Sequence, residues 1–309
     1  GRDLLRYPIS PRLAAVLRDA QGLGPEALSR ACAMAAVLES PIARRRGQSV
    51  ELSILAEDLR TGRDEDLPWE AGQIFRQLER LSPPRPAGAG SLAGLWLEAY
   101  ADRLAARQGE GQVYQLIDGR KALLPLEKRQ KPPRLILALE VEETAGAGSA
   151  RQTSVPVYLA CEPAGVEERF PKECAWRMCL DFDEGQRKVV KREKLFFRGL
   201  AIAGRQAALS PADRKAMAAV WAEKFATGEL RHPGRNEHVE QLLARISLAR
   251  RLFSELSFPA MDEDDWRLIY EEACGGRNSW AELQKVSLEA HVSRYLGAAF
   301  SGFLDQAFP

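Results

Sequence analysis

The chain has 309 residues, of which 45% are hydrophobic and 28% charged, and its formal net charge is only +1. This length suits two or three domains of a soluble globular protein, and the balanced charge gives no global argument for a nucleic-acid partner. No run of about 18 apolar residues occurs, so no membrane span is expected. Five scattered cysteines favour a reducing, cytoplasmic setting over a disulfide framework. The chain begins at Gly1 without an initiator Met or a signal peptide, and we expect it to be part of a longer protein.

Residues 1–110 are expected to form a helical domain. Ser10 followed by Pro11 is typical of a helix start, and apolar residues then recur at helical spacing. Further helices are predicted over 25–38, 50–59, 67–81 and, after a Pro/Gly-rich linker at 82–90, over 91–108. The last of these places Arg103 and Arg107 four residues apart on a helix surface, either as a phosphate-binding pair or as a solvated pair.

Residues 111–205 change to a period of two and are expected to form strands. Asp118-Gly119 predicts a hairpin, and Pro156 within an apolar run suggests an edge strand. Five or six short antiparallel strands in about 90 residues favour a small OB-like barrel. Residues 206–309 return to helical spacing and predict a C-terminal helical bundle, so the fold class is α+β with three domains, 1–110, 111–205 and 206–309.

The segment 186–205 carries the strongest local charge in the chain, with seven bases against the single acid Glu193. Its apolar residues are β-branched or aromatic, which predicts a basic strand pair. Such a strand suits a polyanion, and the alternative is a solvated strand face with its charges outward. A second basic run contains Lys128, Arg129, Lys131 and Arg134.

No catalytic chemistry is evident in the sequence. It lacks a Gly-x-x-x-x-Gly-Lys-Ser/Thr phosphate loop and a dinucleotide fingerprint, so it offers no nucleotide site of these kinds. The three histidines lie far apart, and Asp181 with Asp183 is better read as a hairpin end than as a metal site. We expect no catalytic residue, metal or cofactor in this chain, and whether its parent protein is an enzyme is left open by these residues.

Nucleic-acid binding is the function that the charge pattern favours. Single strands are held by grooves that combine cations with aromatic platforms. Tyr114, Phe196 and Phe197 are either platforms or core residues. The candidate phosphate-binding residues are Arg103, Arg107, Arg120, Lys121, Lys188, Lys191, Arg192 and Lys194.

Four stretches resemble the C-terminal half of HrpB-type ATP-dependent helicases, which are relatives of the DEAH-box RNA helicases. They are Pro8–Leu17, similar to Pro-x-x-Pro-Arg-Leu-Ala; Ala99–Ala105, similar to Ala-Tyr-Pro-Asp-Arg-Ile-Ala; Tyr114–Ala122, similar to Tyr-x-Leu-x-Asn-Gly-Arg-Gly-Ala; and the basic residues 189–193. Leu304–Pro309 also resembles a Leu-Asp-x-x-Ala-Pro segment. Ala101, Asp118 and Lys121 depart from the family pattern.

The resemblance implies a helical ratchet and an OB-like domain that close a channel over single-stranded RNA, or DNA. It also implies two RecA-like motor domains upstream in the same polypeptide, which bind ATP and Mg²⁺ and carry all of the catalysis. The chain would then be a non-catalytic part of a hydrolase.

A protein-interaction scaffold is the alternative function. Residues 255–289 hold nine acids and three bases, which would suit a basic partner.

Overall fold

The computed structural model describes residues 2–40, 48–63, 68–86, 88–127, 129–145 and 151–308. The chain divides into two compact units. The first contains residues 1–176 and 195–203, and the second contains residues 177–194 and 204–309. Each unit has its own hydrophobic core, and each is described separately below. The division at 110 and 205 that the sequence suggests stays a prediction.

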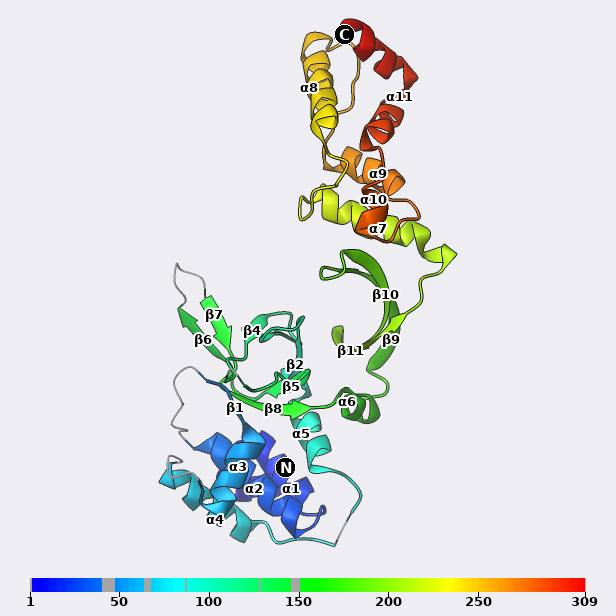
Figure 1. Ribbon diagram of the computed structural model, residues 1–309. Coiled ribbons are helices and arrows are strands. Elements are labelled where there is room, and N and C mark those ends of the chain that lie inside the picture. Colours follow the sequence, from blue (N-terminus) through cyan, green and yellow to red (C-terminus); the bar gives the residue numbers. More distant parts are fainter. Residues whose placement is uncertain are drawn as a thin grey trace. The chain divides into compact units, whose positions relative to one another are not determined.

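The helical part of the first unit carries an Ala- and Leu-rich core. Its elements are η1 (Arg2–Arg6), α1 (Pro11–Ala20), α2 (Pro25–Glu39), α3 (Leu52–Thr61), α4 (Trp69–Leu81), α5 (Leu92–Tyr100), η2 (Ala101–Arg103) and α6 (Pro163–Arg169). Helix α2 is central, with α1, α3 and α4 packed around it (Figure 1). The run Ala31 to Val37 of α2 is almost completely buried, because small side chains let neighbouring helices approach closely.

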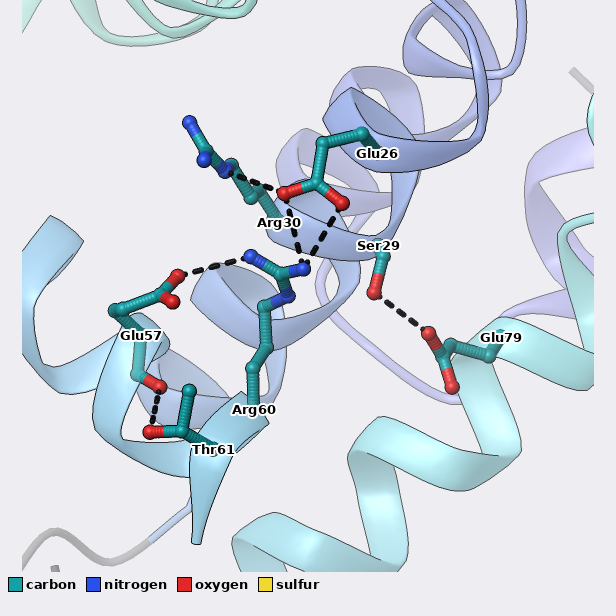
Figure 2. Close-up of polar contacts among 7 residues, drawn as sticks. All are labelled: Glu26, Ser29, Arg30, Glu57, Arg60, Thr61 and Glu79. Carbon is teal, nitrogen blue, oxygen red and sulfur yellow. Dashed lines mark hydrogen bonds and ion pairs between the residues drawn. The ribbon is translucent and has the colours of Figure 1, made fainter. Parts of the chain in front are cut away.

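Polar side chains fix α3 and α4 against α2 at their outer edges. The Arg60 guanidinium of α3 donates to the Glu26 carboxylate of α2 at 3.0 Å and to Glu57 of its own helix at 2.8 Å. The Ser29 hydroxyl of α2 donates to Glu79 of α4 at 2.7 Å (Figure 2). These contacts set how α4 is rotated about its own axis, with Ala71 and Leu78 buried.

An eight-stranded curled sheet is the larger β element of the first unit. Its strands are β1 (Val50–Glu51), β2 (Leu104–Arg107), β3 (Val113–Leu116), β4 (Lys121–Leu123), β5 (Leu135–Ala138), β6 (Glu142–Ala145), β7 (Arg151–Ser154) and β8 (Val157–Cys161), in the spatial order β1-β8-β5-β2-β3-β4-β7-β6. Strand β5 is buried on both faces. Leu135 and Leu137 pack into the helical core, whereas Ile136 and Ala138 pack with Tyr114 on the other face.

Two local predictions differ from the structure. The helix that begins at Leu92 ends at Tyr100, and Leu104–Arg107 is a strand, because Ala105 pairs with Leu116 of β3 and Ile136 of β5. Tertiary pairing thus overrides the helical spacing, and Arg103 and Arg107 do not share a helix face.

Pro156 does not mark an edge strand. It separates β7 from β8, and β8 lies between β1 and β5. The predicted hairpin at Asp118-Gly119 is confirmed between β3 and β4.

The basic stretch belongs to a second, three-stranded sheet. This sheet contains β9 (Cys174–Asp183), β10 (Lys188–Phe197) and β11 (Leu200–Ala207), in the order β11-β10-β9. The mixed fold with two helical regions is as expected; the strands form two sheets, and the small OB-like barrel is not confirmed. The reason is local: β9, β10 and β11 are long and joined by short turns, so they satisfy one another's hydrogen bonds.

The second unit contains residues 177–194 of this sheet, and the rest of it is mainly helical. Its elements are η3 (Pro211–Asp213), α7 (Arg214–Ala226), α8 (Glu237–Leu252), α9 (Glu263–Ala273), α10 (Trp280–Leu283) and α11 (Leu288–Ala307). Helices α7 and α9 pack closely, and α11 packs against both α8 and α9 (Figure 1). Helix α11 is interrupted at Gly297, which has a positive φ of 82°. Within the described ranges, no helix has the length and apolar character needed to cross a membrane.

Candidate nucleic-acid interface

Five bases of the segment 186–205 are engaged in ion pairs. Lys191 binds Asp213 at 2.9 Å, Arg192 binds Asp183 at 2.9 Å, Lys194 binds Asp181 at 2.7 Å, Arg205 binds Glu193 at 2.5 Å, and Arg198 binds Glu173. Four of these acids lie outside the segment 186–205, so its local excess of charge is largely compensated by the fold. The cations Lys191, Arg192 and Lys194, all predicted to contact phosphate, are therefore already paired in this structure.

Of these three cations, Lys191 makes the most hydrogen bonds to its acidic partner. Its ammonium donates to both carboxylate oxygens of Asp213 at 2.9 Å, and the backbone N–H and hydroxyl of Ser210 each donate to Asp213 at 2.7 Å. The hydrogen bond from Lys191 and those from Ser210 lower the pKa of Asp213 to about 2. The pair closes the N-terminal end of α7, which is a structural role.

Two bases at the start of β10 have no carboxylate partner among the described residues. The guanidinium of Arg187 lies over the Trp280 ring, 3.6 Å from its centroid, and Lys188 forms a backbone bridge with Ser279. The Lys188 side chain is half-buried. Arg187 thus anchors the β9–β10 turn to α10, and Lys188 is the only predicted site residue of β10 whose described surroundings leave its charge unpaired.

Arg103 and Arg120 line one cavity of about 470 Å³ in the first unit. Arg120 is bound to Asp118 at 2.8 Å and Glu143 at 3.1 Å, and its hydrogen bond lowers the pKa of Asp118. Arg103 donates to the carbonyl of Leu139 at 3.3 Å. With Asp102 also in its wall, the cavity carries three acids and two arginines, a mixture that does not suit a polyanion.

A different group of cations is unpaired. Arg129, Lys131 and Arg134 are exposed, and no carboxylate within the described ranges pairs with them. Arg107 joins them, because its backbone N–H and its guanidinium donate to the carbonyls of Arg134 and Pro132, each at 3.0 Å. We call Arg107, Arg129, Lys131 and Arg134 the loop cluster.

The segment that carries the loop cluster is held in place by a hydrogen bond from a buried tyrosine. The hydroxyl of Tyr114, a fully buried residue of β3, donates to the carbonyl of Pro133. Pro132 and Pro133 also restrict the backbone that carries the three exposed cations. Lys128, part of the same basic run, lies outside the described residues, and Glu127 is the one acid of the 127–134 segment. The backbone that carries the cluster is therefore ordered before an anion binds.

Lys121 lies on the opposite face of the sheet from Arg107. Arg107 shares a cross-strand row with Tyr114, whereas Lys121 faces Gln115 in the adjacent row. Lys121 is exposed and has no ion-pair partner in the part of the chain that the structure describes. The four predicted residues of the first unit are thus divided among three places and do not form one site.

The proposed aromatic platforms are mainly core residues. Tyr114 and Phe197 are fully buried, and Phe197 packs on Phe170. Phe196 is half-buried. Sequence reasoning missed the most exposed aromatic side chain of the described residues, Trp69 at the start of α4, which is 70% exposed. Its spacing could have revealed it, because Trp69 lies outside the apolar stripe formed by Ala71, Phe75 and Leu78.

The acids of residues 255–289 have structural roles. Asp262 caps α9 and forms a capping box with Asp265, and Glu282 does the same with Ser279 at α10. Glu272 is paired with Arg294. These contacts reduce the acidic surface on which the protein-interaction alternative depends.

No family model matches the chain, and no curated protein matches it. Two solved structures align with it over 99% of its length, each with a TM-score of 0.45 and 21% sequence identity. They are described as the E. coli DExH-box NTPase HrpB and the Escherichia coli DEAH/RHA helicase HrpB. The chain spans 36% and 37% of those two proteins, little more than a third of their length.

Proposed function

We propose that this chain is a non-catalytic, nucleic-acid-binding part of an ATP-dependent RNA helicase, and that it holds single-stranded RNA at the loop cluster. The single observation that supports this most is the presence of four adjacent cations, three of them exposed, with no carboxylate partner among the described residues. In the segment 186–205, by contrast, five of the seven bases are paired with acids. Cations left unpaired on a positioned segment suit the phosphates of a single strand.

The helicase setting is supported by the sequence stretches that resemble HrpB-type enzymes. The chain itself does not fit an ATP site, because it contains no phosphate loop to cradle a triphosphate. ATP and Mg²⁺ would therefore be bound by RecA-like motor domains of the same polypeptide. In this arrangement the loop cluster positions the strand without reading its sequence, since Arg and Lys contacts to phosphate carry no base information.

Binding of a labelled single-stranded RNA, measured by fluorescence anisotropy across a salt series, tests the proposal. Each phosphate neutralised on a single strand contributes a slope of about −0.7 in log affinity against log salt, so the four cations predict a slope of about −3. Sequence should matter little, and a labelled single-stranded DNA in parallel establishes which nucleic acid is preferred. Absence of binding at low salt would contradict the proposal for this chain.

A further inference from the structure

Helix α4 presents a row of exposed side chains that no packing requirement explains. Trp69, Gln73, Arg76 and Arg80 are spaced by four, three and four residues, which places them on one face of an α-helix. All four are exposed, and Trp69 is 70% exposed. We call these four residues the α4 stripe; it extends about 16 Å along the helix.

The stripe lies opposite the buried side of the helix. Ala71 and Leu78 are completely buried, and Glu79, on the flank, is held by Ser29 of α2 (Figure 2). The stripe is therefore turned away from α2 by contacts that involve none of its own members. Asp64, Glu65 and Asp66 precede α4 and lie outside the described residues.

The charged groups and the aromatic ring of the α4 stripe have no partner among the described residues. Arg76 and Arg80 form no ion pair, and Trp69 makes no ring contact, with any residue that the structure describes. With 70% of Trp69 exposed, its indole ring is accessible for stacking. An aromatic platform followed by two cations one turn apart combines the two elements by which single-stranded nucleic acids are held.

We propose that the α4 stripe is a second contact for single-stranded nucleic acid, with one base stacked on Trp69 and phosphates bound by Arg76 and Arg80. A polyanion is the occupant favoured here, because the cations have no acidic neighbour on the stripe. This inference rests on the proposed function, and it adds a surface that the loop cluster does not include. It also supplies the aromatic platform that Tyr114 and Phe197, both buried, do not provide.

Two variants separate stacking from charge, both measured by anisotropy with labelled single-stranded RNA over a salt series. Trp69→Ala should weaken binding by about fivefold or more at every salt concentration, because stacking does not depend on counterion release. Arg76→Gln with Arg80→Gln should weaken binding by roughly 25-fold at about 0.1 M salt and reduce the salt slope by about 1.4. Lys172→Gln, an exposed and unpaired cation off the stripe, and Ile54→Ala, an exposed apolar residue on α3, are the matched controls.

All of the stripe side chains are exposed, so circular dichroism should show unchanged folding in these variants. The inference would be overturned if both stripe variants bind RNA as the two control variants do, or if Trp69→Ala alone weakens binding, which would indicate a partner other than a polyanion. A wild-type chain that does not bind RNA would refute the proposed function itself. Binding that survives the stripe variants but is lost when the loop cluster is neutralised would refute the stripe alone.

Discussion

Strand β10 and the loop cluster are both basic in sequence, but the fold treats them differently. Lys191, Arg192 and Lys194 each meet an aspartate, and two of these aspartates, Asp181 and Asp183, come from the neighbouring strand β9. Arg129, Lys131 and Arg134 meet none among the described residues. Charge density along a sequence therefore does not measure the charge available to a ligand, because acids that are distant in sequence can compensate one cluster and leave another uncompensated.

Neutralising each cluster in turn is the strongest test of this difference. The triple variant Arg129→Gln, Lys131→Gln, Arg134→Gln should bind single-stranded RNA on the order of 100-fold more weakly at about 0.1 M salt, with a slope reduced by about 2. The matched triple variant Lys191→Gln, Arg192→Gln, Lys194→Gln should lose less than about threefold, since each of its cations is already paired with a carboxylate. Anisotropy titrations give both values. An equal loss in the two variants would show that the ion pairs of β10 open to bind RNA.

A fall in pH should lower the folding stability of the second unit, which carries the ion pairs of β10. His232 of the second unit is buried between Phe225 and Tyr270, and burial, with a smaller contribution from His291, lowers its pKa to about 4. The unfolded chain binds a proton near pH 6.5, so the stability that neutral His232 contributes is present above that pH and is lost as the pH falls toward 4. Between pH 7 and pH 5 the loss is about 2 kcal/mol.

Urea unfolding monitored across this pH range measures the effect of His232. The variant His232→Gln should lose most of the pH dependence, whereas His238→Gln, at an exposed position, should retain it. If the pH dependence is the same in both variants, another group is responsible for it.

Much of the secondary structure could be predicted from the sequence, because it depends on local signals. The Asp118-Gly119 turn is read from two adjacent residues, and the structure confirms it. The cap at Asp262 and the capping box at Ser279 depend in the same way on a few adjacent residues. Strand β2 could not be predicted in this way. The stretch Leu104 to Arg107 has no local β preference, and its conformation is set by pairing with β3 and β5, where its partners are 7 to 33 positions away.

The candidate interface was less predictable than the fold for a related reason. The positions of the basic residues were plain in the sequence, but their partners were not: Asp213 is 22 positions from Lys191, and Glu173 is 25 from Arg198. Trp69 was not among the candidate residues, and only the packing of α4 shows that its ring is outside the core. Whether a side chain is available to a ligand depends on the tertiary structure, and it cannot be read from the sequence alone.

The support beneath the loop cluster can be tested separately from its charge. Tyr114→Phe removes the hydroxyl that donates to Pro133, which should cost about 1 kcal/mol of folding stability and weaken RNA binding by a few-fold as the segment loosens. Tyr158→Phe is the control, because its hydroxyl has no hydrogen-bond partner among the described residues although its ring is buried. Urea unfolding and anisotropy report the two effects. A variant that loses stability but keeps full affinity would show that the segment does not need this anchor in order to bind.

The smallest expected effect concerns stability and is the most direct contrast between a paired and an unpaired cation. Lys194 and Asp181 are 2.7 Å apart and each is 26% exposed, so Lys194→Gln should reduce the free energy of unfolding by about 0.5 kcal/mol. Lys131→Gln removes an exposed cation with no described partner and should leave that free energy unchanged. The urea midpoints of the two variants and of the wild type, measured at low and at high salt, resolve this difference, and the Lys194 effect should shrink as salt screens the pair. If Lys131→Gln is the more destabilising of the two, then Lys131 has a structural partner and the loop cluster is not free to bind phosphate.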